Sequence, residues 1–270
     1  DGWQEERSVL LGQQTVVTAT QGFGRKKKFK RWVEFSEDDQ ILRTANVESP
    51  FSLRTALFPE KDMTLFAFYN STFSGIAVNG YLAGSTVFLD FNLNGKFDED
   101  DEPAGVSSSN GGFEIEISDE EIFNHDVNEN GIIDPDEGVL VVLNGMDRAS
   151  GLPLEISYKA PPSYSVITAI SNLVTEFIEE GLGLSTAEEI VSRYLSLPEG
   201  INFSTFEPLR EMQQNGTKAK EFVLKSTELA NVLNQGALYL EIVSGNRISR
   251  IQGADLIVNS IKNEIIKKSP

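Results

Sequence analysis

The sequence contains two ladders in which Asp and Asn alternate, each interrupted by a glycine and followed by a dense run of acids. The first reads "DFNLNGKFDEDDE" over Asp90–Glu102, and the second reads "DVNENGIIDPDE" over Asp126–Glu137. Carboxylates this close repel one another at neutral pH, because like charges are unfavourable neighbours without a counter-charge. The ladders therefore need a neutralising partner or a fold that keeps the acids in solvent.

The charge of the chain is concentrated around these ladders. Sixteen Asp and Glu residues lie between positions 90 and 137 against the single cation Lys96, so this window holds −15 of the net charge of −18. The rest of the chain is close to neutral. A chain with such a local anionic region is a poor partner for nucleic acid and a good one for a metal cation.

The spacing of both ladders matches a calcium-binding loop. Such a loop takes oxygen ligands from positions 1, 3, 5, 7, 9 and 12 of twelve residues, with a glycine at position 6 for the sharp turn. Gly95 and Gly131 fill position 6. In the second ladder the ligand positions are Asp126, Asn128, Asn130, the Ile132 carbonyl, Asp134 and Glu137. In the first they are Asp90, Asn92, Asn94, the Lys96 carbonyl, Asp98 and either Asp101 or Glu102, which lies one residue late. We predict two Ca²⁺ sites.

Two alternative roles for the ladders stay open. Asp, Asn and Gly form turns without a ligand, because they tolerate left-handed backbone and hydrogen-bond locally. The acids could also serve a hydrolase, although one His and no Cys leave little material for a zinc site or a Ser-His-Asp triad. His125, which directly precedes the second ladder, is interpreted as a bystander. We predict that the chain is not an enzyme.

The first 160 residues have the pattern of β-strands. Short β-branched and aromatic runs bounded by turn residues predict strands at 15–20, 31–35, 63–69, 85–91, 112–117, 139–143 and 154–158. "FEIEI" alternates apolar and acidic residues, as a half-buried strand does, whereas "VFL" and "VLVVL" predict strands covered on both faces. The first ladder follows a strand, so we expect an EF-hand-like loop between strands.

After the proline pair at 161–162, apolar residues recur at helical spacing. They predict helices at 165–183, 185–197, 218–243 and 247–268, the second capped by Ser185 or Thr186. The expected fold class is α+β, with an N-terminal antiparallel β-sandwich that carries the calcium loops and a C-terminal helical module. The expected domains are a β-rich segment of unknown role at 1–75, the calcium-binding β-sandwich at 76–160, and the helical module at 161–270.

The stretch "VNGYLAGSTVFLDFNLNGKFDEDDEPAGVSSSNGGFEIEI" resembles the repeated module of large bacterial surface and adhesin-type proteins. In that family the pattern "DGYLxGAxVxxDxNxNGxxDxGEPxxxTxxxGxF" lies on a transthyretin-like or carboxypeptidase-regulatory-like β-sandwich. The matching residues are Gly80, Tyr81, Leu82, Gly84, Val87, Asp90, Asn92, Asn94, Gly95, Asp98, Glu102, Pro103, Gly112 and Phe113. The resemblance covers about residues 76–200, with departures at "NGMDRASG" and "ITAISNLV". It implies an exported, calcium-stabilised, non-catalytic building block.

We therefore expect an extracellular or cell-surface structural or adhesive protein of a bacterium, such as a surface-layer, filament or matrix component. The alternative is a carbohydrate-binding or accessory module of a polysaccharide-degrading system. The sequence has no apolar run long enough to predict a membrane span. The basic run at 25–31 could bind anionic polysaccharide, or the acidic region 90–137 of a second copy in a homo-oligomer or filament, although a solvated loop is the simpler interpretation.

Overall fold

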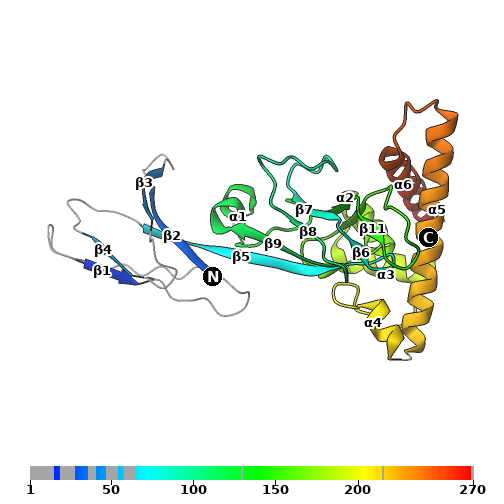
Figure 1. The fold of residues 1–270 in the computed structure, drawn as a ribbon, viewed down its shortest axis with the longest axis horizontal. Coiled ribbons are helices and arrows are strands. Elements are labelled where there is room, and N and C mark those ends of the chain that lie inside the picture. Colours follow the sequence, from blue (N-terminus) through cyan, green and yellow to red (C-terminus); the bar gives the residue numbers. More distant parts are fainter. Residues whose placement is uncertain are drawn as a thin grey trace. The chain divides into compact units, whose positions relative to one another are not determined.

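The computed structural model describes the backbone of residues 15–18, 28–35, 41–46, 54–57 and 65–268, without Glu129 and Asn215. Side chains are described from Ser71 onward in that range, other than those of Asp119 and Lys268. The fold is mixed α+β, with several sheets and six helices among the described residues (Figure 1).

The chain divides into two compact units. One consists of Asp1–Phe73 with Glu116–Ile132, and the other of Ser74–Ile115 with Ile133–Pro270. The boundaries between the units fall within two strands, β5 (Leu65–Ala77) and β9 (Gly112–Ser118), and between Ile132 and Ile133. The units do not coincide with the three domains expected from the sequence, whose division stays a prediction.

The described part of the first unit is built from antiparallel pairs and one short helix. Strand β1 (Thr15–Thr18) pairs with β4 (Arg54–Leu57), and β2 (Lys28–Phe35) pairs with β3 (Ile41–Asn46) and with β5. Within the described residues, β1, β2 and β5 confirm the strands predicted at 15–20, 31–35 and 63–69. Helix α1 (Asp119–His125) begins at a capping box, because the Ser118 and Glu121 side chains each accept the other residue's backbone N–H.

The second unit contains a four-stranded antiparallel sheet. Its order is β12 (Tyr158–Ala160), β10 (Val139–Leu143), β7 (Thr86–Asp90) and β8 (Ala104–Val106). Four consecutive residues of β7 and four of β10 are buried, which confirms that these strands are covered on both faces.

The strand predicted at 154–158 is wrong in all but its last residue. Pairing with β10 begins only at Tyr158, because the preceding apolar residues serve the core and not a ladder. Leu154 and Ile156 are buried, and the Leu154 N–H donates to the Gly145 carbonyl outside the sheet.

Three short strands complete the sheets of the second unit. Strand β6 (Leu82–Ala83) pairs with β11 (Met146–Asp147), and β13 (Val166–Ile167) pairs in parallel with the end of β5. Strand β9 also pairs with β5, and its side chains alternate between buried and exposed as predicted. Gly111, directly before β9, has a left-handed φ of 77°, which glycine adopts without a Cβ penalty.

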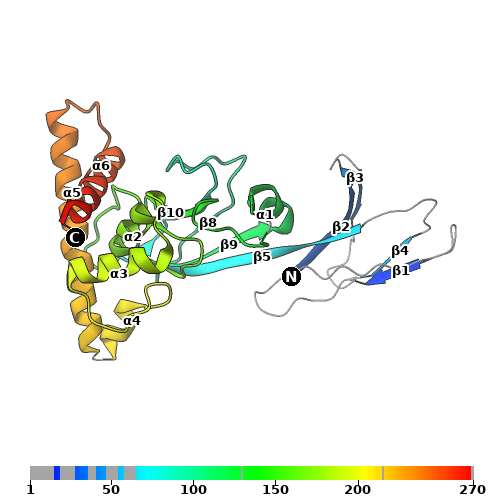
Figure 2. The same ribbon diagram turned by 180° about the vertical axis from the view of Figure 1, so that it is seen from behind.

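Five helices follow in the second unit: α2 (Ala169–Glu179), α3 (Leu184–Leu195), α4 (Pro208–Gln213), α5 (Thr217–Val243) and α6 (Arg250–Lys268). Helices α5 and α6 lie side by side, as Figure 1 and the reverse view in Figure 2 both show. They pack closely because Gly253 has no side chain, and a Cβ there would lie 3.0 Å from the Cα of Ala237. The predicted cap of α3 is wrong: Gly183 precedes the helix without a side-chain cap, and Ser185 and Thr186 lie inside it.

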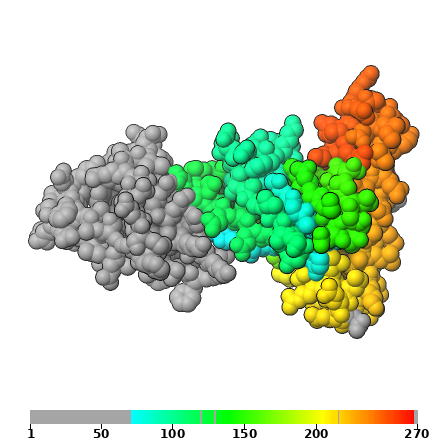
Figure 3. Space-filling model, in the orientation of Figure 1, coloured from blue at the N-terminus to red at the C-terminus, as the bar shows by residue number. Residues whose placement is uncertain are grey.

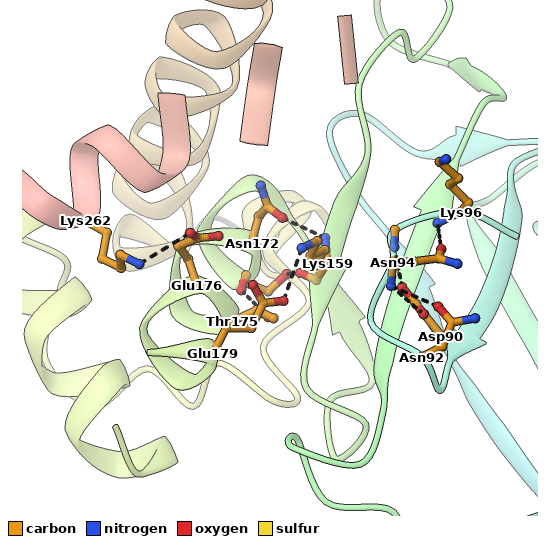
Figure 4. A network of polar contacts seen from close by, with 12 residues as sticks. Asp90, Asn92, Asn94, Lys96, Lys159, Asn172, Thr175, Glu176, Glu179 and Lys262 are labelled. Atoms are coloured by element: carbon orange, nitrogen blue, oxygen red, sulfur yellow. Dashed lines mark hydrogen bonds and ion pairs between the residues drawn. The ribbon is translucent and has the colours of Figure 1, made fainter. Parts of the chain in front are cut away.

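An ionic network joins α2 to α6. The Nζ of Lys262, whose side chain is 5 % exposed, lies 3.6 Å from the Oε1 of Glu176 (Figure 4). It also lies 2.5 Å from the Oε2 of Glu180. Burial raises the pKa of Glu176, and the pKa of Asp255 on α6 is raised for the same reason. The ion pairs therefore connect the two helices, while burial makes the ionised forms of Glu176 and Asp255 less favourable than they are in water.

Candidate metal-binding loops

Asp90, the last residue of β7, anchors the first loop. It is 1 % exposed, its Oδ1 accepts the N–H of Asn94 at 3.2 Å, and its Oδ2 accepts the N–H of Gly95 at 2.7 Å. Gly95 has a φ of 71°, a backbone conformation that glycine adopts without a Cβ penalty. The turn at position 6 therefore wraps the backbone around the first carboxylate.

The two asparagines of the first loop continue the same pattern (Figure 4). The Oδ1 of Asn92 accepts the N–H of Asn94 at 3.1 Å, and the Oδ1 of Asn94 accepts the N–H of Lys96 at 2.6 Å. Both Nδ2 groups donate to the Oδ2 of Asp98, at 2.8 and 3.0 Å, which lowers the pKa of Asp98. The amide oxygens each keep a second lone pair, which a cation can use.

Glu102 closes the first loop. Its Oε2 accepts the N–H of Asp98 at 3.0 Å, and it is 6 % exposed. Asp101 is exposed and contributes its backbone N–H to the Asp98 carbonyl at 3.1 Å. Of the two closing acids that the sequence left open, Glu102 is thus the one whose carboxylate bonds to the loop.

The carboxylate of Glu102 is only half satisfied. Its Oε1 is buried and has no hydrogen-bond partner. Burial raises the pKa of this carboxyl to about 7; the nearby Asp90 and Asp98 carboxylates add to the rise, and the Asp98 N–H opposes it. A buried oxygen without a donor costs free energy that a hard cation would remove. The oxygen-only donor set of this loop fits calcium.

An aromatic side chain fastens the first loop to the core. Phe97, at the eighth position, is half-buried and packs against a buried cluster of Phe88, Val139 and Val141. Its ring centroid lies 5.3 Å from that of Phe88. The loop surface around residues 92–101 is otherwise mostly exposed and can be followed in Figure 3. Asp90, Phe97 and Glu102 therefore anchor the loop to the core of the second unit.

The first half of the second loop belongs to the first unit and follows α1. Asp126, 8 % exposed, accepts the N–H of Asn130 at 3.0 Å on Oδ1 and that of Gly131 at 2.5 Å on Oδ2. The Oδ1 of Asn128 accepts the Asn130 N–H at 3.1 Å, and the Oδ1 of Asn130 accepts the Ile132 N–H at 3.0 Å. These bonds repeat those of the first loop at equivalent positions.

The closing half of the second loop, residues 133–137, belongs to the second unit. The N–H of Asp134 donates to the Oε2 of Glu137 at 2.9 Å, as the N–H of Asp98 does to Glu102 in the first loop. Glu137 is 7 % exposed, and Ile133, at the eighth position, is 5 % exposed. The first loop thus has the same closing bond with one extra residue before its glutamate.

Local turn chemistry accounts for many of these bonds by itself, since Asp and Asn side chains readily accept backbone N–H groups. Within the described residues, no three His, Asp or Glu side chains gather in a group that could hold a metal ion. A cation in either loop would therefore depend on asparagine and backbone oxygens as well as on acids. Among the described helices, none has the length and apolarity needed to cross a bilayer.

The basic segment 25–31 is described only in part. Residues 25–27 lie outside the described residues, and 28–31 begin β2, whose side chains are not described. Self-assembly through this segment and the acidic region 90–137 therefore stays a prediction, as does binding of anionic polysaccharide.

Sequence reasoning missed three features of the loops. It did not assign the eighth-position side chains Phe97 and Ile133 to the core, although both are large and apolar within an otherwise polar loop. It also missed α1, although Ser118 and Glu121 have the spacing of a capping box. The second loop consequently follows a helix, whereas the first follows a strand.

Comparison with known proteins found no match for this chain among protein-family models, curated proteins or solved structures.

Proposed function

We propose that this chain is an extracellular structural or adhesive protein of a bacterium, stabilised by calcium in its two Asp/Asn loops. The first loop would use Asp90, Asn92, Asn94, the Lys96 carbonyl, Asp98 and Glu102 as ligands. The second would use Asp126, Asn128, Asn130, the Ile132 carbonyl, Asp134 and Glu137. Bound calcium would neutralise the acids and satisfy the buried Oε1 of Glu102, and its binding free energy would add to the stability of the fold.

One observation carries this proposal more than any other. Glu102 is nine-tenths buried, and its Oε1 lacks a partner beside the Asp90 and Asp98 carboxylates. If the loop were only a turn, an apolar residue could pack at position 102 without the desolvation cost of a buried acid. A ligand acid explains both its burial and its free oxygen.

The attachment of the first loop to the sheet favours a structural role for its calcium site. Asp90 ends a buried strand and Phe97 packs on a buried cluster, so the loop is fixed to the sheet at both points. Such a loop suits a site that holds structure, whereas a sensor needs a pair of elements that move when the ion binds. Export, adhesion and bacterial origin rest on the sequence resemblance and are part of the proposal.

Thermal unfolding with and without calcium tests the proposed function. The full chain is freed of metal with EDTA, dialysed, and melted in 2 mM CaCl₂, in 2 mM MgCl₂, or without divalent ions. We expect calcium to raise the melting temperature and magnesium to do so less, because Mg²⁺ dehydrates reluctantly and prefers octahedral sites. Identical melts in all three buffers would remove the proposal.

Carbohydrate binding is a second candidate, favoured by a groove in the second unit. The groove has a volume of about 770 Å³, within the range of ligand pockets. Hydroxyl, amide and carboxylate groups that can hydrogen-bond a sugar line it, among them Ser108, Asn110, Glu114, Ser165, Thr205 and Glu207.

A glycan array probed with the labelled chain tests this candidate. Binding that is lost in Glu114→Ala and Thr205→Val, and kept in the loop variant Glu102→Gln, would support the groove as a sugar site. An array without any bound glycan would contradict it.

A further inference from the structure

We propose that the two calcium loops are energetically coupled, so that calcium in the first loop raises the affinity of the second, and the reverse. This inference rests on the proposed function, since it concerns the same two loops. It is carried by the residues that join the end of the first loop's strand to the closing half of the second loop, all of which belong to the second unit.

The register of the central strands places the first loop beside the closing half of the second loop, within the second unit. Strand β7 runs into the first loop at Asp90, and β10 leaves the second loop at Val139. These two residues are partners in the antiparallel ladder. The first ligand of one loop therefore lies opposite a residue only two positions after Glu137, the last ligand of the other.

Gly138 lies between the start of the first loop and the closing half of the second loop. A Cβ at this position would lie 3.0 Å from the Cγ2 of Ile133, 3.4 Å from the Cδ1 of Phe91 and 3.5 Å from the Asp90 carbonyl oxygen. Gly138 thus contacts the closing half of the second loop on one side and the start of the first on the other. A shift of either is transmitted through it.

The hydrophobic anchor of the first loop supplies a second link. Phe97 packs against a cluster that contains Val139 and Val141 of β10, which is the strand that the second loop enters. Calcium that orders the first loop therefore fixes Phe97 and, with it, the start of β10. The second ion then orders less chain when it binds, which is the thermodynamic origin of positive cooperativity.

Electrostatics acts in the opposite direction. Calcium in the first loop reduces the negative charge that attracts the second ion, and this effect is screened by salt. Packing contacts are not screened. Positive coupling should consequently be larger in 1 M KCl than in 0.1 M KCl, although both ions bind more weakly there.

Calorimetric titration of the metal-free full chain with CaCl₂ measures the coupling. Glu102→Gln disables the first loop, and Glu137→Gln disables the second by the matching change; circular dichroism of each variant checks its folding. Asp98→Asn, at an exposed carboxylate, replaces Glu102→Gln if that variant does not fold. In 1 M KCl, each remaining loop should bind calcium at least 5-fold more weakly than the same loop in the intact chain, within the 5- to 150-fold range typical of coupled sites.

Gly138→Ala tests the route without removing a ligand. Its methyl group should reduce the coupling at least twofold by separating Ile133 from Phe91, where the coupling is calculated against the isolated affinities that Gly138→Ala itself shows in the Glu102→Gln and Glu137→Gln backgrounds. Gly183→Ala is the matched control, since nothing lies within 4 Å of a Cβ there, and it should leave the coupling intact.

The outcomes separate this inference from the proposed function. Two bound ions whose affinities are equal in the intact chain and in the single-loop variants would overturn the coupling and leave the proposed function standing. In 1 M KCl, a loop that binds calcium more weakly in the intact chain than in the variant whose other loop is disabled would also overturn it. A chain that binds no calcium would overturn the proposed function itself.

Discussion

Replacing Phe97 with alanine separates the hydrophobic anchor of the first loop from its ligands. Phe97 supplies no oxygen ligand, yet it connects the loop to the cluster of Phe88, Val139 and Val141. Phe→Ala changes at fully buried sites cost about 3–5 kcal/mol. Because Phe97 is half-buried, we expect the free energy of unfolding of the calcium-loaded chain to fall by about 1.5–2.5 kcal/mol.

This loss predicts a measurable change in two quantities. For a unit of this size, each kcal/mol shifts the melting temperature by about 2–4 °C, so the variant should melt about 3–10 °C lower in calcium. Calcium affinity should also fall by roughly tenfold, because the ion must then order a loop that is no longer anchored. Differential scanning fluorimetry and calorimetric titration measure the two effects.

Leu143→Ala is the matched control. Leu143 packs against the same cluster but lies at the far end of β10, outside both loops. It should lower the melting temperature similarly and leave calcium affinity almost unchanged. If Phe97→Ala and Leu143→Ala have the same calcium affinity, the idea that the core anchors the loop is wrong.

Three further predictions concern the ligands and the ionic network. Removal of calcium by EDTA should lower the melting temperature by about 10 °C or more, the size expected for a few kcal/mol of ligand binding, and an unchanged melt would count against structural calcium. Glu102→Gln should weaken calcium binding at least tenfold, whereas Asp101→Asn should change it less than threefold; equal effects in titration would mean that the closing acid is wrongly assigned. Lys262→Met removes one of the two cations, Lys159 and Lys262, that offset the charge of the half-buried Glu176, and it should cost about 2–4 kcal/mol at pH 8 in urea unfolding. Since the folded pKa of Glu176 is raised, the folded state holds its proton more strongly than the unfolded state, so stability falls as pH rises above about 4.5. The loss in Lys262→Met should consequently shrink toward pH 5, and a loss independent of pH would refute this assignment.

The sequence predicted the elements whose side chains repeat with a clear period. The alternation of Phe113 and Ile115 with acids gave the correct strand, and the continuous run Val139–Val142 gave a strand buried on both faces. Helix α5 was predicted within one residue of its observed bounds, because apolar residues recur along its whole length.

Elements that depend on contacts distant in sequence were missed. Nothing local distinguishes Leu154 and Ile156, which serve the core, from the residues of a strand. Gly183 before α3 offers no side-chain cap, so the serine and threonine beside it were misleading. Short strands such as β6 and β13 exist only because a partner strand lies beside them.

The same distinction applies to the loops: features set by local hydrogen bonds were predicted, and features set by contacts distant in sequence were not. The ladder spacing placed Asp90, Asn94 and Gly95 correctly relative to one another, since their hydrogen bonds are local. The spacing of the ladder could not decide between Asp101 and Glu102, because the choice depends on which carboxylate is buried in the fold. The opposition of Asp90 and Val139 depends on strand register and likewise had no local signal.

Direct measurement of bound metal tests the central claim most simply. The full chain is equilibrated by dialysis against buffer with 1 mM CaCl₂, and calcium in the protein compartment is compared with the dialysate by atomic emission. We predict an excess of two calcium ions per chain, falling to one in Glu102→Gln. Equal calcium on both sides of the membrane would contradict structural calcium in these loops.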